Sequence, residues 1–123
     1  MPIRNSYTPY DIERTKKAIG YIHRCYMENI SADQLSIEAS IDVRLLQSLM
    51  QFMTGMTVHH YLVKVRIEQA TKDLEDRFEL TIEQIARRHG FNSSSHFIKC
   101  FRERHGITPN EYRYHIINKG KAV

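Results

Sequence analysis

The apolar and polar positions between residues 85 and 102 predict two helices joined by a tight turn. Ile85 and Ala86 are apolar neighbours that suit the buried side of a first helix. Gly90 stands where that helix is expected to stop, because glycine adopts the left-handed backbone conformation without strain. We expect Phe91 to fill the corner and Asn92 or Ser93 to cap the second helix. On that helix the apolar side chains recur at i, i+3 and i+4, so they face one core. They are Phe97, Cys100 and Phe101.

The outer face of this second helix is mostly polar and basic. It carries Ser94, Ser95, Ile98, Lys99 and Arg102. Small polar groups at the start of a helix and cations further along suit the major groove of DNA. An ordinary helical hairpin with a solvated basic face has the same pattern, so this stretch alone leaves both interpretations open.

Apolar stripes at helical spacing predict further helices along most of the chain. We expect them over about residues 11–28, 32–39, 43–54, 57–76 and 108–118. The chain has only five Gly and three Pro, which favours long helices. Residues 1–9 are expected to form a loose arm, and residues 119–123 to fray.

Polar residues at the expected helix starts support these boundaries. Three pairs have the spacing of a capping box, in which a Ser or Thr and a residue three positions later bind each other's backbone N–H. The pairs are Ser31 with Gln34, Thr81 with Gln84, and Thr108 with Glu111. Asp42 is expected to cap the helix that Gly55 ends, and Pro109 suits the first position of the last helix.

The chain contains the same helix-turn-helix unit twice. Leu35 corresponds to Ile85 and Ser40 to Gly90 at an offset of 50 residues, and after the turn the offset is 51. The later pairs are Leu46 with Phe97, Met50 with Phe101, Gly55 with Gly106 and Thr57 with Thr108. A helix of ~20 residues, about 30 Å long, joins the units, which suits two recognition helices one DNA turn apart, roughly 34 Å. We therefore predict an all-α fold with a first unit over about 10–55, a linker helix over about 57–76 and a second unit over about 80–118.

Positive charge is concentrated in the C-terminal third of the chain. Residues 84–123 carry eight Lys and Arg against two acids, and so hold a charge of +6. The whole chain has a net charge of +4, which leaves −2 for residues 1–83. A basic end on a near-neutral body suits a polyanionic partner, and it is also typical of a soluble basic tail.

Composition indicates a single domain in a reducing compartment. A length of 123 residues suits one domain with its own core. No apolar run is long enough to span a membrane, and the N-terminus lacks the apolar core of a signal peptide. Cys25 and Cys100 lie within expected helices, where they suit small buried hydrophobic residues better than a disulfide. We therefore expect a cytoplasmic protein without a membrane partner.

Several motifs resemble the second helix-turn-helix of the AraC/XylS family of bacterial transcription regulators. They are Ile85-Ala86, Gly90-Phe91, Phe97, Phe101-Arg102, Gly106-Ile107-Thr108-Pro109 and Tyr112-Arg113. Residues 55–70 resemble the family's linker, and the whole resemblance covers about residues 11–115. It implies seven helices in two helix-turn-helix subdomains, binding to double-stranded promoter DNA, and usually activation through contact with RNA polymerase. Family members commonly carry a sensory domain, so we expect either a small stand-alone regulator or the C-terminal part of a longer one.

The resemblance, carried over residue by residue, places base-reading side chains on both recognition helices. They are Arg44, Gln47 and Ser48 on the first, and Ser94, Ser95, His96, Ile98 and Lys99 on the second. Arg44 and Lys99 can each donate two hydrogen bonds to guanine, Gln47 can pair with adenine, and Ile98 can touch a thymine methyl. Phosphate contacts are expected from Ser31, Arg66, Thr81, Arg102 and His105. Tyr112 and Arg113 match the motif but are interpreted as structural.

Two other classes of binding protein remain open. Arg44 is the one cation on the reading face of the first recognition helix, and Leu45 and Phe52 can leave an apolar edge exposed. A protein-binding adaptor that uses this edge is one alternative. A non-specific architectural DNA-binding protein is the other.

Catalytic and metal chemistry find little support. His96 and Cys100 have the i, i+4 spacing of some metal sites, but two further ligands are not evident. The serines at 93–95 lack the strand-turn setting of a nucleophile elbow, and no glycine-rich phosphate loop is present. We expect no enzymatic activity, no metal and no cofactor, and a monomer as this chain.

Overall fold

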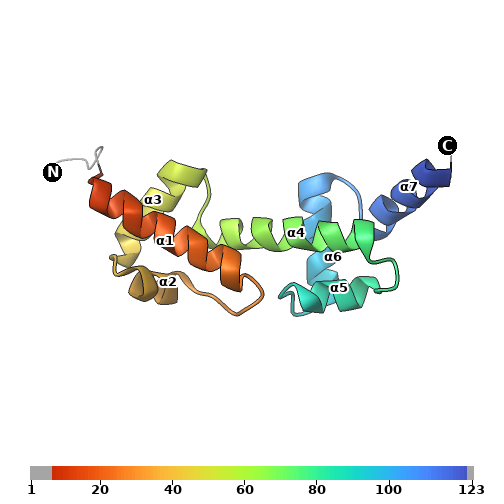
Figure 1. Cartoon of the computed structure of the whole chain (residues 1–123), viewed down its shortest axis with the longest axis horizontal. Coiled ribbons are helices and arrows are strands. Elements are labelled where there is room, and N and C mark those ends of the chain that lie inside the picture. Colours follow the sequence, from red (N-terminus) through yellow and green to blue (C-terminus); the bar gives the residue numbers. More distant parts are fainter. Residues whose placement is uncertain (1–6, 122–123) are drawn as a thin grey trace. The chain divides into compact units, whose positions relative to one another are not determined.

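The computed structural model describes residues 7–121, and this part of the chain contains seven α-helices and no strand (Figure 1). The helices are α1 (Pro9–Cys25), α2 (Ala32–Ala39), α3 (Val43–Thr54), α4 (Val58–Asp76), α5 (Ile82–Arg88), α6 (Ser94–His105) and α7 (Pro109–Lys121). The all-α prediction is confirmed. Among the described helices, none has the length and apolar content needed to cross a membrane.

The seven helices divide into two compact units that meet within α4. The first unit ends at Leu62 and the second begins at Val63. α4 spans the residues where a linker helix is expected, and its two halves belong to different units. Val58 and Leu62 are buried residues of the first half, and Ala70 and Leu74 are buried residues of the second.

The first unit is built around apolar side chains from α1, α2 and α3. Its buried residues include Ala18, Ile22, Leu35, Ala39, Leu46, Leu49 and Met50. Thr15 is also fully buried, and its hydroxyl donates a hydrogen bond to the carbonyl of Asp11 at 3.0 Å. The buried hydroxyl therefore has its hydrogen-bond partner within α1. Because the buried residues of α3 lie on one face of the helix, its opposite face can carry polar residues.

The second unit has an aromatic core. Its buried cluster comprises Ile67, Ala70, Leu74, Ile85, Ala86, Phe91, Phe97 and Phe101. The ring centroids of Phe91 and Phe97 lie 5.1 Å apart, and those of Phe97 and Phe101 lie 5.9 Å apart. Tilted and edge-on ring pairs at these separations stabilise a core beyond simple burial of area. α6 packs against this core through Phe97 and Phe101, and its opposite face is directed outward.

Most helix boundaries follow the prediction, and the differences lie at α1 and α7. α3 begins at Val43 and ends at Thr54, as predicted. α1 begins at Pro9, two residues earlier than expected, because Thr8 and Asp11 form a complete capping box that sequence analysis overlooked. α1 also ends at Cys25, three residues before the predicted end.

The predicted terminal segments are described only in part. α7 runs to Lys121, so residues 119–121 are helical where fraying was expected. Residues 1–6 of the predicted arm and residues 122–123 of the predicted tail lie outside the described residues.

Candidate nucleic-acid interface

α2 and α3 form the first helix-turn-helix, and local hydrogen bonds fix the turn between them. Ser40 adopts the left-handed conformation, with φ 56° and ψ 49°, at the position where a glycine is usual. The carboxylate of Asp42 accepts hydrogen bonds from the N–H groups of Arg44 and Leu45, at 3.0 and 3.3 Å. The cap thus starts α3 at Val43 and places Arg44 and Ser48, both exposed, away from the core.

Gln47 lies at the edge of the same helix and is half-buried. Its Oε1 accepts a hydrogen bond from the N–H of Val58 at 3.2 Å. One turn further along, Gln51 donates from Nε2 to the carbonyl of Gly55 at 3.0 Å. Both side-chain amides of α3 are therefore directed to the turn that leads into α4.

α5 and α6 form the second helix-turn-helix, and its turn has the predicted residues in the predicted roles. Gly90 has a φ of 91°, in the left-handed region that favours glycine. Phe91 fills the corner and is only 3% exposed. The hydroxyl of Ser93 accepts a hydrogen bond from the N–H of His96 at 3.2 Å. Ser93, rather than Asn92, is therefore the cap of α6.

The predicted base-reading residues of α6 occupy its outer face, with different degrees of exposure. Ser95, His96 and Lys99 are exposed, whereas Ser94 and Ile98 are half-buried. The ring of His96 packs edge-on against Phe91, with centroids 5.5 Å apart. An edge-on ring contact of this kind favours one orientation of the imidazole.

Two predicted phosphate-contacting residues lie in the last turn of α6. Arg102 and His105 are exposed, and Arg104 adds a third basic residue to this turn. The imidazole of His105 packs against Phe101 at a centroid distance of 4.3 Å. Burial, and then the charge of Arg104, lower the pKa of His105. At neutral pH His105 therefore offers a hydrogen bond to a phosphate rather than a full positive charge.

Ser31 and Thr81, the other expected phosphate contacts on the surface, act as helix caps. Each hydroxyl accepts a hydrogen bond at 3.1 Å from the backbone N–H three residues later. The first turn of each helix also contains an acid, Asp33 in α2 and Glu83 in α5. These acids reduce the attraction of the helix start for an anion. Any phosphate contact here thus falls to backbone N–H groups.

Arg66, expected to be a surface cation that contacts phosphate, is buried instead. It lies in α4 and is only 8% exposed. Burial also lowers the pKa of its guanidinium. The side chain is therefore packed inside the protein and not on the surface that a phosphate would contact.

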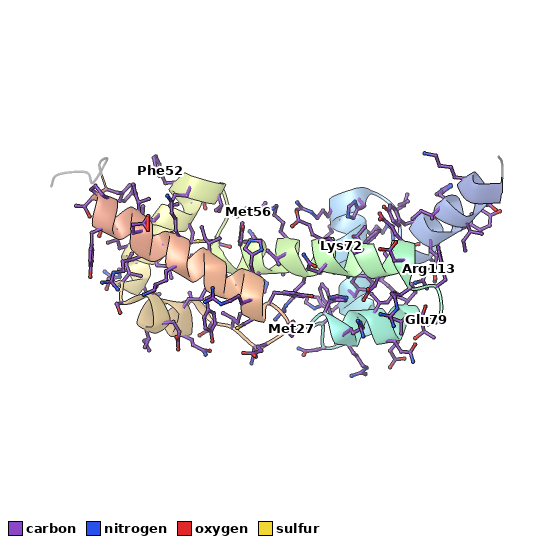
Figure 2. All side chains as sticks on the ribbon, viewed as in Figure 1. Met27, Phe52, Met56, Lys72, Glu79 and Arg113 are labelled. Atoms are coloured by element: carbon purple, nitrogen blue, oxygen red, sulfur yellow. The ribbon has the colours of Figure 1, made fainter. Side chains whose placement is uncertain are left out.

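Tyr112 and Arg113 have the structural roles that sequence analysis gave them. The guanidinium of Arg113 donates hydrogen bonds to backbone carbonyls near the end of α4, beside which Figure 2 labels the residue. The acceptors are Leu80 at 2.7 Å, Arg77 at 3.0 Å, Leu74 at 3.3 Å and Asp73 at 3.4 Å. Tyr112 donates to Glu75, a hydrogen bond that raises the pKa of Tyr112 to about 12. Both residues hold α7 to the end of α4.

His89 and Asp73 form a contact between the turn of the second unit and α4 that the sequence did not predict. His89 is 7% exposed, and its Nε2 lies 2.7 Å from Oδ2 of Asp73. Arg88 donates to the same oxygen at 3.0 Å. The two residues of the pair are 16 positions apart, and no local motif marks them.

The cysteines and histidines do not assemble a reactive or metal-binding centre in the described residues. Burial, reinforced by Glu103 and opposed by Lys99, raises the pKa of the Cys100 thiol. A raised pKa keeps this thiol protonated at neutral pH, and so a poor nucleophile. Residues 7–121 contain no group of three His, Cys, Asp or Glu that can hold a metal ion.

Two helix-turn-helix units, each with a polar outer face on its second helix, define a double helix-turn-helix protein. A family model described as a helix-turn-helix domain matches residues 35–115. The chain is 31% identical over 101 residues to the transcriptional activator RhaS of Mannheimia succiniciproducens. It is 38% identical over 71 residues to the transcriptional activator RhaR of Enterobacter sp.. The chain therefore belongs to the AraC family of helix-turn-helix transcription regulators.

These alignments cover most of this chain but a smaller part of its relatives. The RhaS alignment covers 82% of this chain and 37% of RhaS. The RhaR alignment covers 58% of this chain and 25% of RhaR. The chain thus spans well under half the length of either activator.

Solved structures show the same fold. An AraC-type DNA-binding domain protein from Chromobacterium violaceum is 25% identical, with a TM-score of 0.78, and the match covers 85% of this chain and 92% of that one. The DNA-binding domain of AdpA, solved in complex with a target DNA, has a TM-score of 0.80. That match is 22% identical and covers 86% of this chain and 95% of the other.

Proposed function

We propose that this chain binds DNA sequence-specifically and activates transcription, with α3 and α6 reading two adjacent segments of the major groove. The observation that carries the proposal is the pairing of an apolar inner face with exposed hydrogen-bonding side chains on both helices. Arg44 and Ser48 provide them on α3, and Ser95, His96 and Lys99 on α6. Each helix follows a turn with a residue in the left-handed conformation, Ser40 in one unit and Gly90 in the other.

The strongest base readers in this proposal are the two cations. Arg44 and Lys99 can each donate two hydrogen bonds to the O6 and N7 atoms of guanine. A good bidentate contact discriminates between bases by ~1–3 kcal/mol. Ser48, Ser94, Ser95 and His96 can bind several bases and so specify less, while Ile98 can contact a thymine methyl.

Phosphate contacts supply the part of the affinity that does not depend on sequence. Arg102 is the main candidate, because it is exposed beside the reading face of α6. His105 and the N–H groups at the starts of α2 and α5, next to Ser31 and Thr81, are weaker candidates. The charge of +6 on residues 84–123 favours approach to DNA over a longer range.

The wider role rests on the relatives. RhaS and RhaR are named transcriptional activators. We propose that this chain likewise acts in the bacterial cytoplasm on double-stranded promoter DNA, through contact with RNA polymerase. We further propose that one copy of the chain is enough to occupy a site.

The test measures affinity for a selected duplex and a random duplex at several salt concentrations, by fluorescence anisotropy. Each neutralised phosphate adds roughly −0.9 to the slope of log affinity against log salt. We expect a steep slope on both duplexes and tighter binding to the selected one. A slope near zero would contradict DNA binding, and equal affinity for both duplexes would indicate an architectural protein instead.

One surface feature favours a second candidate, a protein-binding adaptor. Phe52, labelled on α3 in Figure 2, is 67% exposed, and its ring lies 5.4 Å from that of Tyr7. Leu45 is half-buried on the same helix. Capture of a protein partner that Phe52→Ser abolishes, together with no detectable shift of DNA, would favour the adaptor.

A further inference from the structure

The start of α4 needs hydrogen-bond acceptors, because the first N–H groups of a helix have no partner within the helix. The hydroxyl of Thr57 accepts from the N–H of His60 at 3.1 Å. The N–H of Val58 donates instead to Oε1 of Gln47, at 3.2 Å. Gln47 lies 11 residues earlier, on the helix proposed to read DNA. Because Val58 offers a donor, the amide atom that faces it is the oxygen.

The second unit provides an internal comparison for this contact. At the offset of 51 residues, Pro109 stands in the place of Val58 and Ile98 in the place of Gln47. Pro109 has no N–H to satisfy, and Ile98 has no side-chain acceptor. The acceptor is therefore present in the unit that has the donor, and absent in the unit that lacks it.

The capping of the two helices also differs three residues after the capping threonine. At the start of α7, Thr108 and Glu111 bind each other's N–H groups, at 3.1 and 2.8 Å. In the first unit His60 replaces Glu111, so the reciprocal carboxylate is missing there. Glu111 accepts from the N–H of Thr108, whereas Gln47 accepts from the N–H of Val58, one position further into its helix. Gln47 therefore does not replace the missing carboxylate, and it satisfies a donor that the second unit does not have.

Gln51 strengthens the same connection. Its Nε2 donates to the carbonyl of Gly55 at 3.0 Å, in the turn between α3 and α4. The corresponding residue of the second unit is Arg102, which is exposed and carries a guanidinium in place of the amide. The two units therefore use the same two positions differently.

We propose that Gln47 is a positioning residue, whose side-chain carbonyl holds α3 against the start of α4, and that base reading by the first unit depends on Arg44 and Ser48. Pairing with adenine requires both ends of the amide, the oxygen for N6–H and the nitrogen for N7. When the amide oxygen of Gln47 accepts from the Val58 N–H, the oxygen is engaged within the protein and the amide is not placed to make both hydrogen bonds to adenine. The part of this inference that concerns bases rests on the proposed function, whereas the contact with Val58 does not.

The contact is tested by a double-mutant cycle on thermal unfolding of the whole chain. Gln47→Leu removes the acceptor, and Val58→Pro removes the donor by copying the second unit. Since Val58 is 2% exposed, its replacement also changes packing, which the cycle subtracts. We expect Gln47→Leu to lower Tm by about 4 °C in the native background, the shift that loss of one hydrogen bond produces in a small domain. In the Val58→Pro background it should leave Tm unchanged, and equal losses in both backgrounds would overturn the proposal.

Gln47→Glu separates positioning from base reading. It keeps an oxygen for the Val58 N–H and loses the amide nitrogen. We expect Tm to remain close to that of the native chain, because an acid near a helix start is favourable. Binding-site selection with this variant should return the native base preferences, with affinity lowered alike for all sequences by the added negative charge. A change of one preferred base, for instance from adenine to cytosine, would show that Gln47 reads DNA and would overturn the proposal.

The two measurements also distinguish failure of this inference from failure of the proposed function. If the native chain selects no DNA sequence, the proposed function fails, and the unfolding cycle still decides whether Gln47 and Val58 are coupled. If selection succeeds and the cycle is additive, the inference about Gln47 fails alone.

Discussion

His89 and Asp73 join the turn of the second helix-turn-helix to α4 through a partly buried hydrogen bond of 2.7 Å. His89 is the last residue before Gly90, so it lies at the point where the chain changes direction toward α6. The carboxylate can only accept, and Nε2 of His89 therefore carries the hydrogen. The orientation of the turn, and with it the start of α6, is tied to one carboxylate of α4.

Acid should weaken this connection. Burial alone raises the pKa of Asp73, but hydrogen bonds from His89 and Arg88 outweigh burial and hold the pKa of this carboxyl below its usual value. A lowered pKa in the folded state stabilises the protein above the unfolded pKa of about 3.9, and this contribution is lost as pH falls below it. We expect Asp73→Asn to lower Tm clearly at pH 6 and much less near pH 3.

The matched control for this prediction is Asp76→Asn, which changes an exposed carboxylate of the same helix. Its effect on Tm should be small at both pH values. If Asp73→Asn lowers Tm by the same amount at pH 3 as at pH 6, the Asp73 carboxylate is not the source of the expected pH dependence.

Replacing Arg113 should destabilise the second unit strongly. Its guanidinium satisfies carbonyls at the end of α4 and in the following loop, including Leu80 at 2.7 Å and Arg77 at 3.0 Å. Removing a charged donor from several backbone acceptors costs about 2–3 kcal/mol. We expect Arg113→Met to lose about that much in urea unfolding. Arg113→Lys should recover only part of it, because an ammonium cannot bridge the same set of acceptors.

The control for Arg113 is Arg104→Met, which removes an exposed cation from α6. A surface change of this kind should alter the free energy of unfolding by less than about 0.5 kcal/mol. Equal losses for the two variants would mean that Arg113 acts only through its charge.

Ser40 is a site where substitution should raise stability. It is the one described residue other than glycine with a positive φ, 56°, and it occupies the place that Gly90 has in the second unit. A residue with a side chain loses roughly 1–2 kcal/mol of stability in the left-handed region, and glycine avoids this strain. Glycine also has greater conformational freedom in the unfolded chain, which offsets part of the stabilisation. We expect Ser40→Gly to stabilise the protein by about 0.5–1 kcal/mol in chemical denaturation.

Gly106→Ala provides the opposite test. Gly106 has a φ of 81°, and an added Cβ would meet no atom within 4 Å, so only conformational strain should oppose the change. We expect it to destabilise by about 1 kcal/mol. A stabilising effect there would show that backbone conformation does not control these turns.

Much of the fold could be predicted because strong local signals mark the helix ends. α3 has Asp42 at its start and Gly55 at its end, and both signals lie within one turn of the residues they control. The start of α1 was misplaced although Thr8 and Asp11 carry the same kind of signal as Thr108 and Glu111. The end of α7 was expected at about residue 118, with fraying beyond it, but the helix continues to Lys121.

The candidate site was less predictable because long-range contacts decide which side chains are free. Arg66 was expected on the surface, but packing around α4 buries it. Gln47 has a suitable residue type at a position predicted to read bases, yet its hydrogen bond to Val58 depends on the path of the chain after Gly55. The pairing of Asp73 with His89 likewise depends on how α5 packs on α4.

Two neighbouring cations of α6 should affect DNA binding in different ways. Lys99→Ala should reduce discrimination at one base pair, by an amount within the ~1–3 kcal/mol of a good base contact. Arg102→Ala should weaken binding to all sequences alike and reduce the salt slope by about 1. Lys16→Ala, an exposed cation on α1, serves as the control and should change neither property. If the Lys99 and Arg102 variants behave alike, the division between base and phosphate contacts is wrong.

The most direct test of the central claim is binding-site selection from randomised duplexes with the native chain, Arg44→Ala and Lys99→Ala. We expect the selected duplexes to contain two segments of specified sequence whose centres lie about 10 base pairs apart, because successive major-groove sites on one face of DNA have this spacing. Arg44→Ala should relax preference in one segment only, and Lys99→Ala in the other only. A single specified segment, or two variants that relax the same base pairs, would contradict the claim that both recognition helices of one chain read DNA.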